Sequence, residues 1–87
     1  MEKIDLEEIK KEVNCIVMEI IESESSEFDE SLELINDLEF DSMCFLELSI
    51  QIQREFGVII SAPEWEKINT LSKVYETIYS KLKNEGD

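Results

Sequence analysis

The sequence contains no histidine, so it lacks the commonest general base of enzymes and the commonest protein ligand of transition metals. The acidic segment 23–37 does not supply a calcium loop either. An EF-hand beginning at Asp29 would place Leu34 where glycine is required and Phe40 where glutamate is required. We therefore expect a protein that is not an enzyme, with neither catalytic residues nor a metal site.

Basic residues are scarce: eight Lys and Arg stand against 22 Asp and Glu, for a net charge of -14. This charge disfavours binding to nucleic acid or to anionic lipid, and it favours partner proteins with basic surfaces. The sequence also has no apolar run long enough to span a membrane. We expect no nucleic-acid partner and no membrane span.

Cysteine is also rare, and Cys15 and Cys44 are far apart with no paired spacing. With no recognisable signal peptide, this pattern predicts free thiols in a reducing cytoplasm. The 87 residues suffice for one modest core, so we expect a single domain over 1–87 with an ordered part at about 5–82. A domain of this size is too small to support a deep catalytic cleft.

The first element is a helix from Leu6 to about Glu22. Asp5 and Glu8 have the spacing of a capping box, and apolar residues then recur at helical spacing. Cys15 projects to the opposite side, where we expect an exposed thiol without a role. The apolar stripe consists of Leu6, Ile9, Val13, Ile16, Val17 and Ile20.

The segment from Ser23 to Asp37 is rich in serine and acidic residues, with sparse apolar positions. We interpret it as a long ordered loop. Phe28, Leu32 and Ile35 are expected to hold it against the rest of the domain.

A second helix is predicted to begin at Ser42 and to continue to Phe56, because Asp41 is a good N-cap and residues 43–56 contain no Gly or Pro. Ser42 would then stand at the first helical position with its hydroxyl facing outward. The positive end of the helix dipole and the spare backbone N–H groups make such a position favourable for a phosphate. The Asp-Ser pair alone, however, is also what an ordinary helix cap looks like.

This helix has two apolar faces. The core face consists of Phe45, Leu48, Ile52 and Phe56, while Met43, Leu46 and Ile50 lie on roughly the opposite side together with Glu47 and Arg54. A small protein rarely buries a helix on all sides, so the second face is expected to bind a partner or to cover an apolar cargo. The alternative is that Leu46 is partly buried against the long loop.

The remaining chain predicts two further helices, which makes the fold all-α. Gly57 would end the second helix, and residues 58–60 would form a buried connector. Ser61 and Glu64 open a short helix to about Ile68, and Thr70 caps a last one. The inward face of the last helix is Leu71, Val74, Tyr75, Ile78 and Leu82, and residues 84–87 should fray.

Taken together, these residues resemble the acyl carrier protein family. The resemblance covers nearly the whole chain. Its motifs are Leu38, the triplet Asp41-Ser42-Met43, Glu47 and Leu48, then Phe56-Gly57-Val58 with Ile60, Glu66-Lys67-Ile68 and Thr70-Leu71.

The resemblance implies a monomeric four-helix bundle with three longer helices and one short helix. It also implies that a Mg-dependent phosphopantetheinyl transferase attaches 4'-phosphopantetheine from coenzyme A covalently to Ser42, with Asp41 capping the helix and orienting the transferase. The terminal thiol of this arm would hold acyl intermediates as thioesters. Acyl- or aminoacyl-loading ligases, synthases and transferases would dock on Met43, Leu46, Glu47, Ile50 and Arg54 through basic surfaces.

The chain departs from the usual family pattern near this serine. Glu39 stands where the family usually has glycine, so the backbone entering the site is expected to differ. Cys44, Gln53 and Arg54 occupy places that are often acidic in fatty-acid-type carriers, which indicates a specialised set of partners. Cys44 is either an exposed bystander or, less favoured, a sensor thiol.

Three functions stay open from the sequence. The favoured one is an acyl carrier for a fatty-acid-like or a specialised lipid or polyketide pathway. The second is an aminoacyl carrier, because Phe40-Asp41-Ser42-Met43 also resembles D-alanyl carrier proteins, with peptidyl carriers as a related case. The third, from another class, is an acidic helical adaptor that binds a partner protein through its exposed apolar face.

Overall fold

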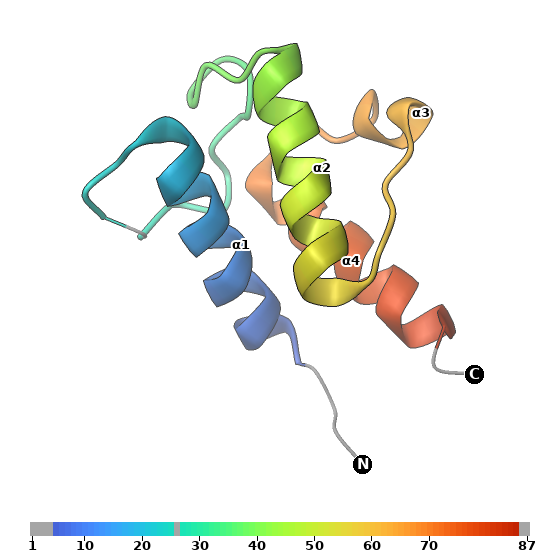
Figure 1. Ribbon diagram of the computed structural model, residues 1–87. Helices are drawn as coiled ribbons and strands as arrows, with labels where there is room; N and C mark the ends of the chain where they lie inside the picture. The colour runs from blue at the N-terminus through green and yellow to red at the C-terminus, as the bar shows by residue number, and fades with distance from the viewer. Residues whose placement is uncertain (1–4, 26, 86–87) are drawn as a thin grey trace.

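The structure is a computed structural model that describes residues 5–25 and 27–85. In this part of the chain there are four helices, three long and one short (Figure 1). They are α1 (Leu6–Ile21), α2 (Ser42–Phe56), α3 (Ala62–Trp65) and α4 (Leu71–Glu85). Helix α1 packs against both α2 and α4, and a long connection joins α1 to α2. The predicted all-α, four-helix architecture is confirmed.

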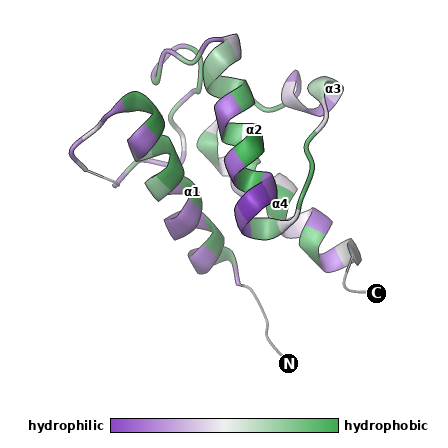
Figure 2. Ribbon diagram, viewed as in Figure 1, coloured by the Kyte–Doolittle hydropathy of each residue, from purple (hydrophilic) through white to green (hydrophobic). Residues whose placement is uncertain are grey.

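The core lies between the three long helices, as the amphipathic patterns predict. Most of the fully buried side chains come from the predicted inward faces of α1, α2 and α4, and the connections add Leu34 and Val58. Leu82 packs at the edge of this core. Figure 2 shows hydrophobic and hydrophilic positions interleaved along these helices. Burial of apolar surface is therefore the main stabilising contribution to the bundle.

Each long helix begins at a side-chain cap, and α1 and α2 each end at a residue with a left-handed backbone. The Asp5 carboxylate accepts a hydrogen bond from the Glu8 N–H at 3.1 Å, and the Thr70 hydroxyl accepts one from the Lys73 N–H at 3.3 Å. Gly57, with φ of 70°, ends α2. Helix α4 continues to Glu85, so the fraying expected at residues 84 and 85 is not found, and residues 86–87 lie outside the described part.

The long connection packs on the core, but through a slightly different residue set from the one predicted. Phe28 and Leu32 contact the core as expected. Leu34 is fully buried, whereas Ile35 is 63% exposed, so the prediction for Ile35 was wrong. The reason is backbone pairing: the Leu34 N–H donates to the Asn69 carbonyl and the Phe40 N–H donates to the Leu34 carbonyl, both at 2.9 Å. These bonds turn the Leu34 side chain inward.

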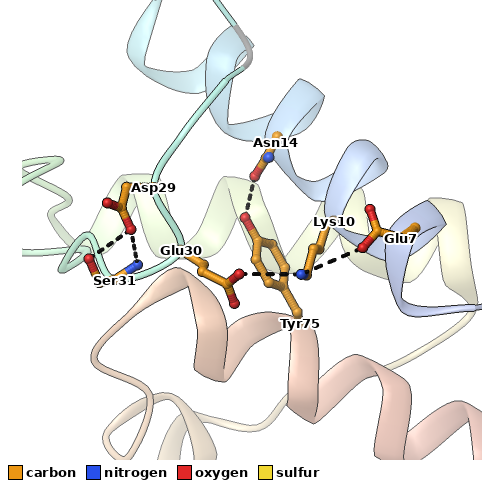
Figure 3. Close-up of polar contacts among 7 residues, drawn as sticks. All are labelled: Glu7, Lys10, Asn14, Asp29, Glu30, Ser31 and Tyr75. Atoms are coloured by element: carbon orange, nitrogen blue, oxygen red, sulfur yellow. Dashed lines mark hydrogen bonds and ion pairs between the residues drawn. The ribbon is translucent and has the colours of Figure 1, made fainter.

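Polar contacts join this connection to α1 and join α1 to α4 (Figure 3). Lys10 on α1 forms an ion pair with Glu30 in the connection at 3.3 Å. The Tyr75 hydroxyl on α4 donates to the Asn14 side chain on α1 at 2.5 Å. Burial raises the pKa of Tyr75 to about 12, so the phenol stays protonated and continues to act as a donor at neutral pH.

The connector between α2 and α3 is hydrophobic (Figure 2), but it is not buried throughout. Val58 and Ile60 are buried, while Ile59 is 65% exposed, which corrects the prediction of a fully buried connector. In an extended segment, successive side chains point to opposite sides. Because the side chains of Val58 and Ile60 point into the core, that of Ile59 between them points into solvent.

Helix α3 is shorter than predicted because it ends at Trp65 rather than near Ile68. The N–H groups of Lys67 and Ile68 donate to carbonyls three residues earlier, which tightens the chain into a turn. Glu64 accepts from both the backbone N–H and the hydroxyl of Ser61 and forms an ion pair with Lys81 at 2.8 Å. The Lys81 ammonium and the Ser61 donors lower the pKa of Glu64 to about 2.

Among the helices that the structure describes, none is long and apolar enough to cross a membrane.

Candidate functional site

Ser42 is exposed and is the first residue of α2, at the end of the helix that faces the long connection (Figure 1). Asp41 precedes it in an extended conformation, and its carboxylate accepts a hydrogen bond from the Cys44 N–H at 3.0 Å. This hydrogen bond lowers the pKa of Asp41, so the cap is ionised at neutral pH. The predicted cap and the predicted start of the helix are both confirmed.

The chemistry of this position fits a phosphodiester. Ser42 is exposed at the positive end of the α2 dipole, although the Asp41 carboxylate already accepts a hydrogen bond from the Cys44 N–H of the first turn. The carboxylates of Asp41 and Glu39 nearby are also exposed, so solvent screens their repulsion of a bound anion. The helix dipole therefore favours a phosphate on this hydroxyl, while the carboxylates of Asp41 and Glu39 oppose it.

The backbone entering the site is left-handed at Glu39, where φ is 59°. This is the conformation that glycine adopts without strain, and glycine is the residue usually found here in the resembling family. Glu39 thus occupies a conformation in which a glycine would carry no strain. Glu39 adopts a backbone conformation that is costly for a side chain with a Cβ atom.

This strain predicts that Glu39→Gly stabilises the protein. Relief of the left-handed strain stabilises the folded state by about 1 to 2 kcal/mol. The greater chain entropy of glycine stabilises the unfolded state by about 0.5 to 1 kcal/mol and so opposes this gain. We expect a net gain of up to about 1.5 kcal/mol in the free energy of unfolding, measured in urea. Glu39→Gln is the matched control, because it removes the charge but keeps the strain. Equal gains in both variants would assign the effect to charge instead.

The second face of α2 is exposed, as its pattern predicted. Met43 is 70%, Leu46 54% and Ile50 45% exposed, and the side chains of Glu47 and Arg54 are exposed beside them. We call these five residues the α2 face. The alternative in which Leu46 is buried against the long loop is not found. An exposed apolar stripe of this kind is typical of a surface that contacts another molecule.

A shallow hollow of about 380 Å³ lies next to the α2 face, between α1 and α2. Its lining residues are Glu19, Ile20, Met43, Cys44, Glu47 and Gln51. The sequence did not predict that α1 contributes Glu19 and Ile20 to this hollow. Helical periodicity shows which residues share one face of a helix, but it does not show which residues of another helix lie beside that face. Cys44 is half-buried here rather than an exposed bystander.

Comparison with known proteins agrees with this site. Residues 11–78 match the family model described as a phosphopantetheine attachment site. The chain is 34% identical over 76 residues to the acyl carrier protein of Thermotoga maritima, covering 87% of this chain and 94% of that protein. It is 33% identical over 81 residues to the acyl carrier protein of Cyanidium caldarium, covering 93% and 94%.

A third relative is named polyketide-8 synthase acyl carrier protein 2, from Streptomyces avermitilis, and is 27% identical over 73 residues, or 84% of each chain. The match to the attachment-site model extends from within α1 to within α4 and so includes the whole site described above. The chain therefore belongs to the acyl carrier protein family, whose members are non-enzymatic carriers that bind 4'-phosphopantetheine covalently.

Proposed function

We propose that Ser42 is the residue to which the phosphopantetheine arm is attached. The observation that carries this proposal is an exposed serine hydroxyl at the first position of α2, directly after its capping aspartate. In the loading reaction, the Ser42 oxygen forms a bond to the phosphorus that bears pantetheine in coenzyme A. The bond from that phosphorus to the adenosine bisphosphate breaks, and the serine proton passes to a base of the transferase.

When bound, the arm supplies a terminal thiol on which an acyl group is held as a thioester. The residues of this chain have supporting roles: Ser42 is the anchor, and Asp41 keeps the first turn of α2 formed and presents a negative charge to the transferase. A tethered thioester has a high effective concentration at each enzyme that binds the carrier. The two free cysteines fit a reducing compartment such as the cytoplasm.

The α2 face is the proposed docking surface for loading ligases, synthases and transferases with basic surfaces. Met43, Leu46 and Ile50 supply apolar contact, Glu47 supplies charge, and Arg54 makes the far end of the face less acidic. A small contact steered by charge gives fast association and short residence, which suits a carrier that visits several enzymes. The unusual Arg54 and Gln53 support a specialised set of partners.

Charge reversal at Glu47 should therefore weaken docking. We expect Glu47→Lys to lower turnover by a partner enzyme about 10-fold or more, chiefly through KM, because a lost favourable charge becomes a repulsive one. Helical content should not change, since exposed substitutions shift stability by less than about 0.5 kcal/mol. Turnover is measured with loaded carrier as the varied substrate.

Glu55→Lys is the matched control for this experiment. Glu55 is an exposed acid on the same helix, but it lies off the α2 face. An equal loss of turnover in both variants would mean that only the overall charge matters, and would contradict a docking surface at this face.

We further propose that the cargo is an acyl group of a fatty-acid-like or a specialised lipid or polyketide pathway. Support comes from the names of the relatives, two called acyl carrier proteins and one named for polyketide synthesis. An aminoacyl cargo is the second candidate, because the tetrad Phe40-Asp41-Ser42-Met43 resembles that of D-alanyl carriers. Intact-mass analysis after incubation with acyl- and aminoacyl-loading ligases separates these two cargoes.

The proposal is tested by incubating the apo protein with coenzyme A, Mg²⁺ and a broad-specificity phosphopantetheinyl transferase. We expect the intact mass to rise by one phosphopantetheinyl group, with the modified peptide containing Ser42. No gain in mass would contradict the proposal and favour the adaptor, which needs only the exposed α2 face.

A further inference from the structure

Three aromatic rings meet at the end of the bundle where Ser42 lies. Phe40 comes from the long connection, Phe45 from the first turns of α2, and Trp65 from α3. The ring centroids of Phe40 and Phe45 are 5.3 Å apart and edge-on, and those of Phe45 and Trp65 are 5.4 Å apart. We call these residues the aromatic cluster. At such distances the rings are in van der Waals contact, with no room for a further chain between them.

Trp65 is held in this cluster by more than stacking. Its indole N–H donates to the Ser49 hydroxyl on α2 at 2.7 Å. The neighbouring Glu64 binds Lys81 on α4 at 2.8 Å, so α3 is attached to both long helices beside it. Helix α3 has no buried residue of its own, so these contacts and the buried Ile60 and Ile68 on either side hold it in place. Trp65 thereby fills the space between α2 and α3.

An apolar cargo carried from Ser42 gains free energy wherever it can leave water, in proportion to the surface it buries. On the α3 side of Ser42, the aromatic cluster occupies the apolar interior. On the α1 side, the hollow is open to solvent, and its lining mixes the apolar side chains of Ile20 and Met43 with the carboxylates of Glu19 and Glu47. Neither side gives a long alkyl chain an enclosed apolar space to enter.

We infer that this carrier transports short or polar acyl groups rather than long alkyl chains, and that Trp65 is the residue that sets this limit. The inference rests on the proposed attachment at Ser42. A short or polar group loses little by staying in solvent at the end of the arm. A long alkyl chain finds no enclosed apolar site in this bundle and stays largely in water until an enzyme binds it.

The test compares three loaded forms of the intact protein, which carry a butyryl, octanoyl or dodecanoyl group on the arm. The phosphopantetheinyl transferase makes each form by moving the whole acyl-phosphopantetheinyl group from the corresponding acyl coenzyme A to Ser42. Thermal unfolding midpoints are measured for each. We expect the three midpoints to agree within about 3 °C, because a chain in water is equally solvated in the folded and unfolded states. Burial of even half of the eight methylenes that distinguish dodecanoyl from butyryl would raise the midpoint by more than about 10 °C.

Trp65→Ala and Trp65→Leu remove the ring and open space between α2 and α3. In these variants we expect the midpoint to rise from butyryl to dodecanoyl by more than about 5 °C. Phe56→Leu is the control. It also replaces a partly buried aromatic residue by a smaller one, but Phe56 lies at the end of α2 opposite to Ser42. It should lower all three midpoints equally.

Tryptophan fluorescence gives a second readout, since Trp65 is the only tryptophan of the sequence. Its emission maximum should not change with chain length in the natural protein. A midpoint that rises with chain length, or an emission shift with dodecanoyl, would overturn the inference while leaving attachment at Ser42 intact. If the unfolding midpoint did not rise with chain length in the Trp65 variants, Trp65 would not be the residue that limits chain length. A protein that gains no mass at all would overturn the proposed attachment site, and the inference with it.

Discussion

Ser42→Ala will abolish the mass gain on incubation with coenzyme A and the transferase, while the fold stays intact. The substitution removes the only oxygen that can form the phosphodiester at the start of α2. The cap is unaffected, because Asp41 and not Ser42 accepts the hydrogen bond from the Cys44 N–H. We therefore expect complete loss of loading with less than about 0.5 kcal/mol change in stability.

Ser61→Ala is the matched control for this loss. Ser61 is also an exposed serine at the start of a helix, but it precedes the four-residue α3 rather than α2. Loading should be complete in this variant. If Ser42→Ala still gained mass, or if Ser61→Ala did not, the attachment site would be assigned wrongly. Intact-mass spectrometry and circular dichroism on the same samples distinguish lost attachment from lost folding.

Leu48→Ala will destabilise the protein severely. Leu48 is fully buried on the core face of α2, and truncation of such a residue costs about 2 to 5 kcal/mol through lost burial and the remaining cavity. A domain of this size has a total stability of roughly 0.05 to 0.15 kcal/mol per residue, so this cost is a large fraction of it. We expect the unfolding midpoint to fall by more than about 10 °C, measured by thermal circular dichroism.

Leu46→Ala makes the same chemical change two residues away, on the α2 face. Leu46 is 54% exposed, so its truncation should cost less than about 0.5 kcal/mol. Both variants replace leucine by alanine within α2, so a difference in stability between them measures the effect of burial alone. Similar losses in the two variants would show that α2 is buried on both faces and that the proposed docking surface is wrong.

The individual helices of this protein could be predicted from the sequence because their signals are local. Asp5, Asp41 and Thr70 begin the long helices, as side-chain caps act within three residues of their own position. Gly57 ends α2 because a left-handed backbone suits glycine. The two faces of α2 follow from its 3.6-residue period, and so does the outward position of Ser42.

Other features depended on contacts between distant segments. Leu34 rather than Ile35 is buried because its backbone pairs with Asn69, and no local pattern reveals that partner. The left-handed Glu39 is likewise imposed by the surrounding chain, since its own side chain disfavours that conformation.

The sequence by itself determined the helices, their faces and the serine that begins α2, because caps and periodicity act over one or two turns. Only the tertiary structure decided which residues of α1, Glu19 among them, line the hollow beside α2. It alone also brought Phe40, Phe45 and Trp65 together at the Ser42 end. The physical reason is that packing between helices depends on the shapes of side chains far apart in the sequence, and local preferences do not encode that register.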